Sequence, residues 1–149
     1  MYKSTIKLSS VAAIALLFTS CGESKYAQCN KLIKIVNEAA FFGRQYRNNT
    51  NDNNTNDAQA TQGLTEIASK IDQLSTDMKG LKIQDDKLQS YQIRLIKLYQ
   101  DISKGLNDTA TAINKKDIKQ TNRLLAALQK SSVEQRSIQN DMSNYCLSE

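Results

Sequence analysis

Residues 60–81 read ATQGLTEIASKIDQLSTDMKGL, and their apolar side chains follow a single row along one face of a helix. Spacings of four and three residues alternate without a break along this stretch. This is the heptad pattern of helices that pack side by side, because it keeps one face apolar over many turns. The row consists of Ala60, Leu64, Ile67, Ile71, Leu74, Met78 and Leu81.

Three further segments have helical periodicity, and no segment keeps the period of two that is typical of a strand. The first segment runs from about residue 25 to residue 46, with apolar positions at Leu32, Ile33, Val36, Ala39, Ala40 and Phe42. The third repeats the heptad row with Leu88, Tyr91, Leu95, Leu98, Ile102, Leu106, Thr109 and Ile113. The fourth places Leu124, Leu128, Ser131, Gln135, Ile138, Met142 and Tyr145 at heptad positions. Its polar middle predicts looser packing there.

The first break between these segments lies in residues 47–57, which read RNNTNDNNTND. Asn and Asp compete with helical hydrogen bonds and favour turns and caps, so this stretch predicts an exposed loop. A calcium loop is the alternative, because Asp52 and Asp57 offer oxygen ligands. Two carboxylates without a Glu support that alternative only weakly.

The other two breaks are shorter. Gly80 and the acidic pair Asp85 and Asp86 predict that one helix ends and the next begins between residues 80 and 86. Residues 114–117 predict the last turn, where Asp117 can cap the fourth helix.

Composition limits the possible functions. The chain of 149 residues is long enough for one domain, and it contains no Pro, no Trp and no His. Without Pro, long helices can run uninterrupted, and without His the commonest general base and metal ligand is missing. The sequence also has no Gly-rich phosphate loop and no CxxC pair. We therefore expect no catalytic residue, no metal site and no cofactor.

The first twenty residues are typical of an export signal. Lys3 and Lys7 form a short cationic region, and residues 11–18 form an apolar run too short to span a bilayer. Removal of residues 1–20 would lower the formal net charge from +5 to +3. Such a mild positive charge is not a nucleic-acid signature, so no nucleic-acid partner is expected.

Residues 17–21, LFTSC, resemble the lipobox of bacterial lipoproteins. Thr19 and Ser20 are small, as in that pattern, and Phe18 stands where an aliphatic residue is usual. An ordinary signal peptide would need a small residue in place of Phe18. The resemblance implies that a peptidase cuts before Cys21 and that the Cys21 sulfur carries a diacylglycerol. Residues 21–24 would then be a lipidated tether in the bacterial cell envelope, facing the periplasm or the cell exterior.

The three cysteines are Cys21, Cys29 and Cys146. Lipidation of Cys21 would leave an even pair in an oxidising compartment, so we expect a disulfide between Cys29 and Cys146. Short connections make successive helices antiparallel, which predicts an all-α, up-down four-helix bundle in residues 25–149. In that topology the first helix begins where the fourth ends, and the two thiols meet. The disulfide end would face the membrane.

Residues 24–33 resemble the start of uncharacterised helical proteins of cyanobacteria, a resemblance that covers about one helix and implies no activity. From the residues we expect a non-enzymatic, membrane-anchored extracytoplasmic module with a structural role or an unknown protein partner. One alternative is a ligand-binding or sensing bundle, with Ser131, Ser132 and Gln135 lining a pocket. Another is an inhibitor or immunity-type protein that blocks an enzyme.

Overall fold

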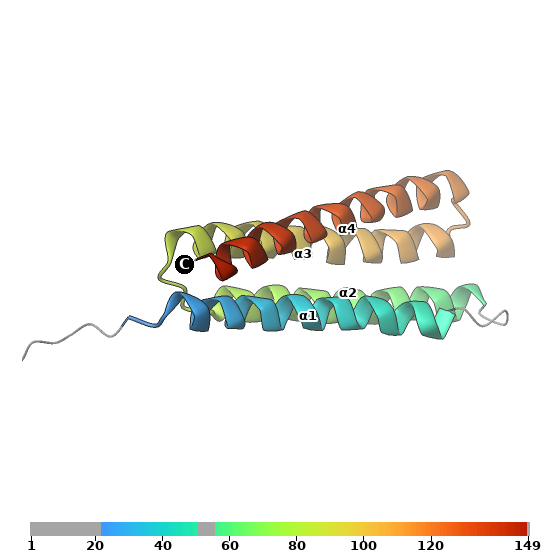
Figure 1. Cartoon of the computed structure of the whole chain (residues 1–149). Helices are drawn as coiled ribbons and strands as arrows, with labels where there is room; N and C mark the ends of the chain where they lie inside the picture. The colour runs from blue at the N-terminus through green and yellow to red at the C-terminus, as the bar shows by residue number, and fades with distance from the viewer. Residues whose placement is uncertain (1–21, 51–55, 149) are drawn as a thin grey trace, which may run out of the picture.

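The computed structural model describes residues 22–50 and 56–148, which form four helices (Figure 1). These are α1 (Lys25–Thr50), α2 (Asp57–Gly80), α3 (Asp86–Asn114) and α4 (Ile118–Leu147). Successive helices pack on one another, and a disulfide joins α1 to α4. The predicted all-α antiparallel bundle with its disulfide closure is confirmed.

The predicted start of the first loop is wrong. Helix α1 does not end near Tyr46 but continues to Thr50. The physical reason is that Asn costs only a fraction of a kcal/mol in a helix, whereas Pro or Gly costs about 1 kcal/mol or more. A short run of Asn is therefore too weak a signal to end a helix. Asp52, one of the two residues of the calcium alternative, lies outside the described residues.

Acidic or amide side chains cap the N-termini of the three helices α2, α3 and α4. The Asn56 side chain accepts a hydrogen bond from the Gln59 N–H at 2.9 Å, and the Asn56 N–H donates to Gln59 Oε1 at 3.2 Å. Asp85 accepts from the Leu88 N–H at 2.9 Å. The cap predicted at Asp117 is confirmed, because its carboxylate accepts from the Gln120 N–H at 2.9 Å. Each such cap satisfies an amide that the first helical turn leaves unpaired.

The core occupies one half of the bundle. We call this the disulfide half: residues 29–39 of α1, 71–78 of α2, 88–99 of α3 and 138–146 of α4. Its fully buried side chains include Leu32, Met78, Leu95, Ile138 and Met142. Burying each one stabilises the fold by roughly 1.5 to 3 kcal/mol. Tyr99 is also fully buried here, and its hydroxyl has no hydrogen-bond partner among the described residues.

At the other end, the distal half, α4 is packed more loosely, whereas Leu64 of α2 and Ala110 of α3 are still buried. The distal half contains residues 40–50 of α1, 57–70 of α2, 100–114 of α3 and 118–137 of α4. Helix α4 lies against α1 at the disulfide end and diverges from it toward its own N-terminus (Figure 1). Leu124 and Leu128, both predicted to be core positions, are only half-buried, like Ser131 and Gln135 between them and the core. The polar middle of α4 therefore agrees with the predicted looser packing, but the looseness extends further than predicted.

Helices α3 and α4 nevertheless stay in contact in the distal half. A Cβ added at Gly105 of α3 would lie 3.0 Å from Leu128 Cδ2 of α4, so the two backbones come close at this point. The turn that joins them contains Lys116, whose φ of 55° is the left-handed conformation that L-residues adopt at some cost. The distal half of α4 thus stays packed on α3 while it diverges from α1.

Candidate functional site

The predicted cysteine pair is present. Cys29 near the start of α1 and Cys146 at the end of α4 form a disulfide with their Cα atoms 6.0 Å apart. The two residues are 117 positions apart in the sequence. Cys29 is buried, whereas Cys146 is half-buried at the edge of the core. The bond therefore fixes the end of α4 on α1 where the core begins.

The predicted lipid acceptor, Cys21, lies outside the described residues. The described chain starts at Gly22, and residues 22–24 lead into α1 at the disulfide end. A Cβ at Gly22 would lie 3.2 Å from Gln84 Oε1, in the link between α2 and α3. The start of the described chain therefore lies against this link, at the same end as the disulfide.

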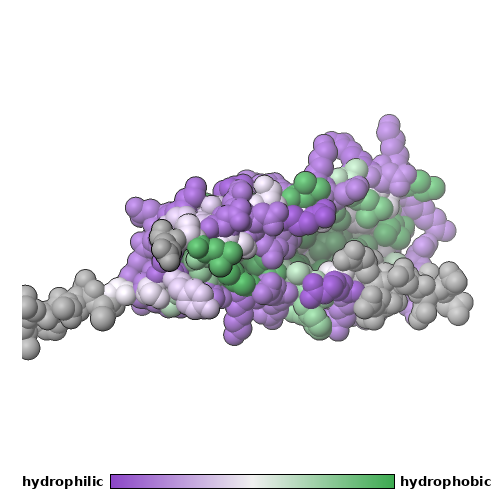
Figure 2. All heavy atoms as spheres, in the orientation of Figure 1, coloured by the Kyte–Doolittle hydropathy of each residue, from purple (hydrophilic) through white to green (hydrophobic). Residues whose placement is uncertain are grey.

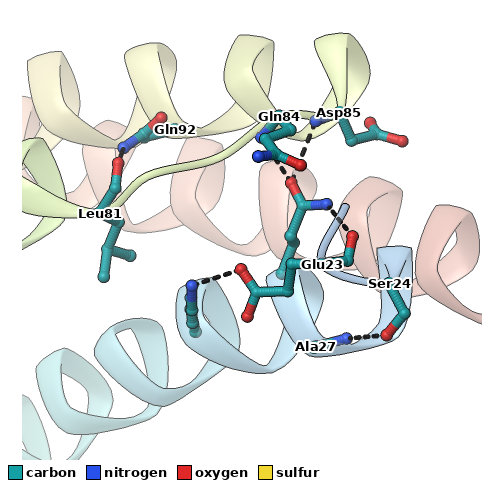
Figure 3. Close-up of polar contacts among 9 residues, drawn as sticks. Glu23, Ser24, Ala27, Leu81, Gln84, Asp85 and Gln92 are labelled. Atoms are coloured by element: carbon teal, nitrogen blue, oxygen red, sulfur yellow. Dashed lines mark hydrogen bonds and ion pairs between the residues drawn. The ribbon is translucent and has the colours of Figure 1, made fainter. Parts of the chain in front are cut away.

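Gln28 ties three segments together at this end. Its side chain is 3% exposed. The amide nitrogen Nε2 donates to the Glu23 carbonyl at 2.7 Å, and Oε1 accepts from the backbone N–H groups of Gln84 at 2.6 Å and Asp85 at 3.0 Å. Figure 3 shows Glu23 beside the link that carries Gln84 and Asp85. One buried amide thus joins the segment before α1, α1 itself and the α2–α3 link.

Asp85 receives a second tie, from α4. The Tyr145 hydroxyl donates to Asp85 Oδ2 at 2.7 Å, while Oδ1 caps α3. Burial would raise the pKa of the Asp85 carboxyl, but hydrogen bonds from the Leu88 N–H and the Tyr145 hydroxyl outweigh it and lower that pKa below its ordinary value. The hydrogen bond to Asp85 also raises the pKa of Tyr145 above its ordinary value, as do burial and the nearby negative charge. The ionised carboxylate and the protonated phenol stabilise each other.

Lys25 lies over the same tyrosine. Its ammonium is 5.0 Å from the centre of the Tyr145 ring and donates to the Tyr145 carbonyl at 3.3 Å and to the Ser148 carbonyl. A cation placed this way interacts with the ring face and also with the carbonyl end of α4. The first turn of α1 and the last turn of α4 are therefore joined by polar contacts as well as by the disulfide.

Sequence reasoning missed two buried amides. Gln92 of α3 donates from Nε2 to the Met78 carbonyl at 2.7 Å and to the Leu81 carbonyl at 3.0 Å, which satisfies the C-terminal end of α2. Gln92 adjoins Tyr91 and lies one turn after Leu88, so its place beside the heptad row was a usable signal. Gln28 offered no such signal, because its partners Gln84 and Asp85 are 56 and 57 residues away.

The other sequence candidates lie in the distal half. Ser132 is exposed, and the Ser131 and Ser132 hydroxyls donate to the carbonyls one turn earlier, so their polar groups are used within α4. An open depression of about 240 Å³ lies instead beside the last turn. It is lined by Asp108, Thr111, Ala112, Lys115, Asp117 and Gln120. The residues of the predicted ligand pocket do not line it.

Within residues 22–50 and 56–148, no three His, Cys, Asp or Glu side chains come together to hold a metal ion. The same ranges contain no helix long and apolar enough to span a bilayer. No protein-family model, curated protein or solved structure matches the chain. The two ends of the bundle differ. One end, beside residues 22–24, is closed by the disulfide and by hydrogen bonds, and the looser end lies about 45 Å away along the 30 residues of α4.

Proposed function

We propose that the protein is a lipoprotein anchored through Cys21 to a membrane of the bacterial envelope, where it serves as an extracytoplasmic structural or protein-interaction module. One observation carries the proposal. The disulfide uses Cys29 and Cys146, so the remaining cysteine is the one in the lipobox-like sequence. A disulfide between buried and half-buried cysteines is typical of oxidising compartments outside the cytoplasm.

The geometry of the disulfide end supports this proposal. Residues 22–24 are all that separates Cys21 from α1, so a lipid on Cys21 would hold the bundle close to the membrane by that end. The segment just after Cys21 is also tied down, by the contacts of Gln28 with Glu23 and the α2–α3 link. A short tether and a firm attachment point suit a module that projects into the compartment.

A binding role fits the residues better than catalysis. The sequence has no His, and the carboxylates of Asp85 and Asp117 are used as helix caps. The buried amides Gln28 and Gln92 are fully engaged with backbone groups. The side chain that most often serves as a general base is therefore missing, and these four polar side chains are occupied in holding the fold.

The proposal is tested by replacing Cys21 with Ala in the producing bacterium. We expect the protein to move from the membrane fraction to the soluble fraction, because a lipid anchor has no other attachment site. The control is the double variant Cys29→Ser/Cys146→Ser, which keeps Cys21 and should remain in the membrane fraction. Intact mass of the membrane-extracted protein should show a chain beginning at Cys21 plus lipid, gaining about 2 Da on reduction of one disulfide. Membrane association that survives Cys21→Ala, or a mass without lipid, would contradict it.

A further inference from the structure

Helix α4 has an unusual outer surface in the distal half. Ile118, Leu125 and Val133 are 75%, 48% and 56% exposed, although each is a large aliphatic residue. At 100° per residue they fall within an arc of about 80° on the helix surface. We call these three residues the α4 stripe. Figure 2 shows hydrophobic surface among hydrophilic side chains over this part of the molecule.

A row of basic residues borders the α4 stripe. Lys119, Arg123 and Lys130 are exposed and lie within an arc of about 40°, directly beside the stripe. None of the three takes part in an ion pair in the part of the chain that the structure describes. Residues 115–137 carry six basic and two acidic side chains, a net charge of +4. The stripe is thus apolar at three positions, with Asn122, Gln129 and Arg136 on the same arc, and it is positive along one edge.

The spacing of the stripe matches a helix. Successive members are seven and eight residues apart, or about 10 to 12 Å along the axis, which is close to the seven-residue repeat of a heptad row. A second helix with apolar residues at this repeat could place one against each member. Its flanking residues would then face Lys119, Arg123 and Lys130, and acidic residues there would be attracted while basic ones would be repelled.

We propose that the α4 stripe binds an amphipathic helix of a partner protein, with aliphatic residues at heptad spacing and Asp or Glu residues along one edge. This inference rests on the proposed function as an interaction module and names the surface and the chemistry of its partner. The stripe lies in the distal half, at the opposite end of the bundle from residues 22–24. An anchored bundle would therefore present it away from the membrane.

Two other occupants fit the stripe less well. A second copy presenting the same face would bring two rows of Lys and Arg together, which opposes association. A lipid surface selects helices with a broad apolar face and interfacial aromatic residues. Residues 118–137 contain no aromatic residue, and Asn122 and Gln129 interrupt the stripe. Both the charge and the narrowness of the stripe therefore favour an acidic helix.

The test uses the purified full-length chain and two synthetic peptides of about three heptads with Leu at the core positions. One peptide carries Glu at its flanking positions, and its twin carries Lys there. We expect the Glu peptide to bind at least about tenfold more tightly than the Lys twin in fluorescence anisotropy, a difference of about 1.4 kcal/mol. Equal affinity for both peptides, or no binding of the Glu peptide, would overturn the proposal.

Matched variants locate the binding. Leu125→Glu should lower the affinity for the Glu peptide at least about tenfold. The control Ile93→Glu changes another exposed aliphatic residue, on α3, and should leave affinity unchanged. Reversal of Lys119, Arg123 and Lys130 to Glu should abolish the preference for the Glu peptide, whereas reversal of Lys34, Lys79 and Lys82 should retain it. Circular dichroism checks that each variant is folded. Binding that ignores Leu125→Glu would overturn the proposal.

Two further measurements separate the other occupants. Sedimentation velocity tests for a dimer, and we expect Leu125→Glu to leave the oligomeric state unchanged. Vesicles of phosphatidylglycerol and phosphatidylcholine test for lipid binding, and we expect Leu125→Glu to leave any such binding unchanged. A stripe-dependent dimer or stripe-dependent vesicle binding would overturn the proposal in favour of that occupant. The Cys21→Ala fractionation is independent of these results. If the Glu peptide does not bind but Cys21→Ala releases the protein from the membrane, only the proposed binding by the α4 stripe is rejected.

Discussion

The two halves of the bundle are built from the same four helices, yet different interactions hold them. In the disulfide half, α4 buries Ile138 and Met142 and is tied to α1 by the disulfide and by Lys25. In the distal half, α4 has no fully buried side chain and exposes Ile118, Leu125 and Val133. The difference shows that a heptad pattern predicts that a helix forms, but not how much of it is buried.

The contrast extends to the polar contacts of the two halves. Amide and phenol hydrogen bonds at the disulfide end position the start of α1, the α2–α3 link and the end of α4 together. The distal half lacks such ties between α1 and α4 among the described residues and keeps aliphatic surface in contact with solvent. The ties of α4 to α1 are thus concentrated at one end, and the surface that we propose for binding lies at the other.

The largest expected effect comes from breaking the covalent tie. The Cys29→Ser/Cys146→Ser variant should lose about 4 to 5 kcal/mol of unfolding free energy, because the bond closes a loop of 117 positions. Urea denaturation followed by circular dichroism measures this. Hydrogen exchange should increase first in α4, which has the fewest buried residues. A loss below about 1 kcal/mol would show that the apolar core and the polar contacts hold the disulfide half together without the bond.

Two truncations of α4 compare the halves directly. Met142→Ala, in the disulfide half, should cost about 3 kcal/mol, because it leaves a cavity in a fully buried site. Leu124→Ala, in the distal half, should cost about 1 kcal/mol, since that side chain is only half-buried. Chemical denaturation of both variants gives the two values. Equal losses would mean that the distal half is packed as firmly as the disulfide half.

The smallest effect concerns acid stability at the disulfide end. The folded-state pKa of Asp85 is lowered, so its ionisation contributes stability above the ordinary value of 3.8, and this contribution is lost as pH falls through the folded-state pKa. Tyr145→Phe removes one of the hydrogen bonds that lower this pKa. It should flatten the dependence of unfolding free energy on pH in the acid range, because less of the stability then depends on the ionised carboxylate.

The control for that experiment is Tyr26→Phe. Tyr26 lies one residue after Lys25 but is 68% exposed, so loss of its hydroxyl should change neither stability nor its pH dependence. Thermal unfolding measured at several pH values between about 3 and 7 compares the two variants. If stability depends on pH in the same way for Tyr145→Phe and the unchanged chain in the acid range, the Asp85–Tyr145 contact does not help to hold α4.

Much of the fold could be predicted because its signals are local. The heptad row of residues 60–81, the cap at Asp117 and the meeting of Cys29 with Cys146 follow from spacing and from antiparallel topology. The role of Gln28 could not be predicted, because its partners come from a link more than fifty residues away. The half-burial of Leu124 and Leu128 also depends on how far α4 diverges from α1, and neither helix carries a local signal for that.

The disulfide also decides how the molecule would respond to mechanical force. Consider tension applied between residues 22–24 and the turn at residues 114–117. The shortest covalent route runs through Cys29, across the bond to Cys146 and back along α4, so α1, α2 and α3 form a slack parallel path. Helix α4 would stretch while most of the core stayed unloaded. Its 30 residues can reach an end-to-end length of about 100 Å when fully extended. The bond therefore directs the applied force to the helix with the fewest buried residues.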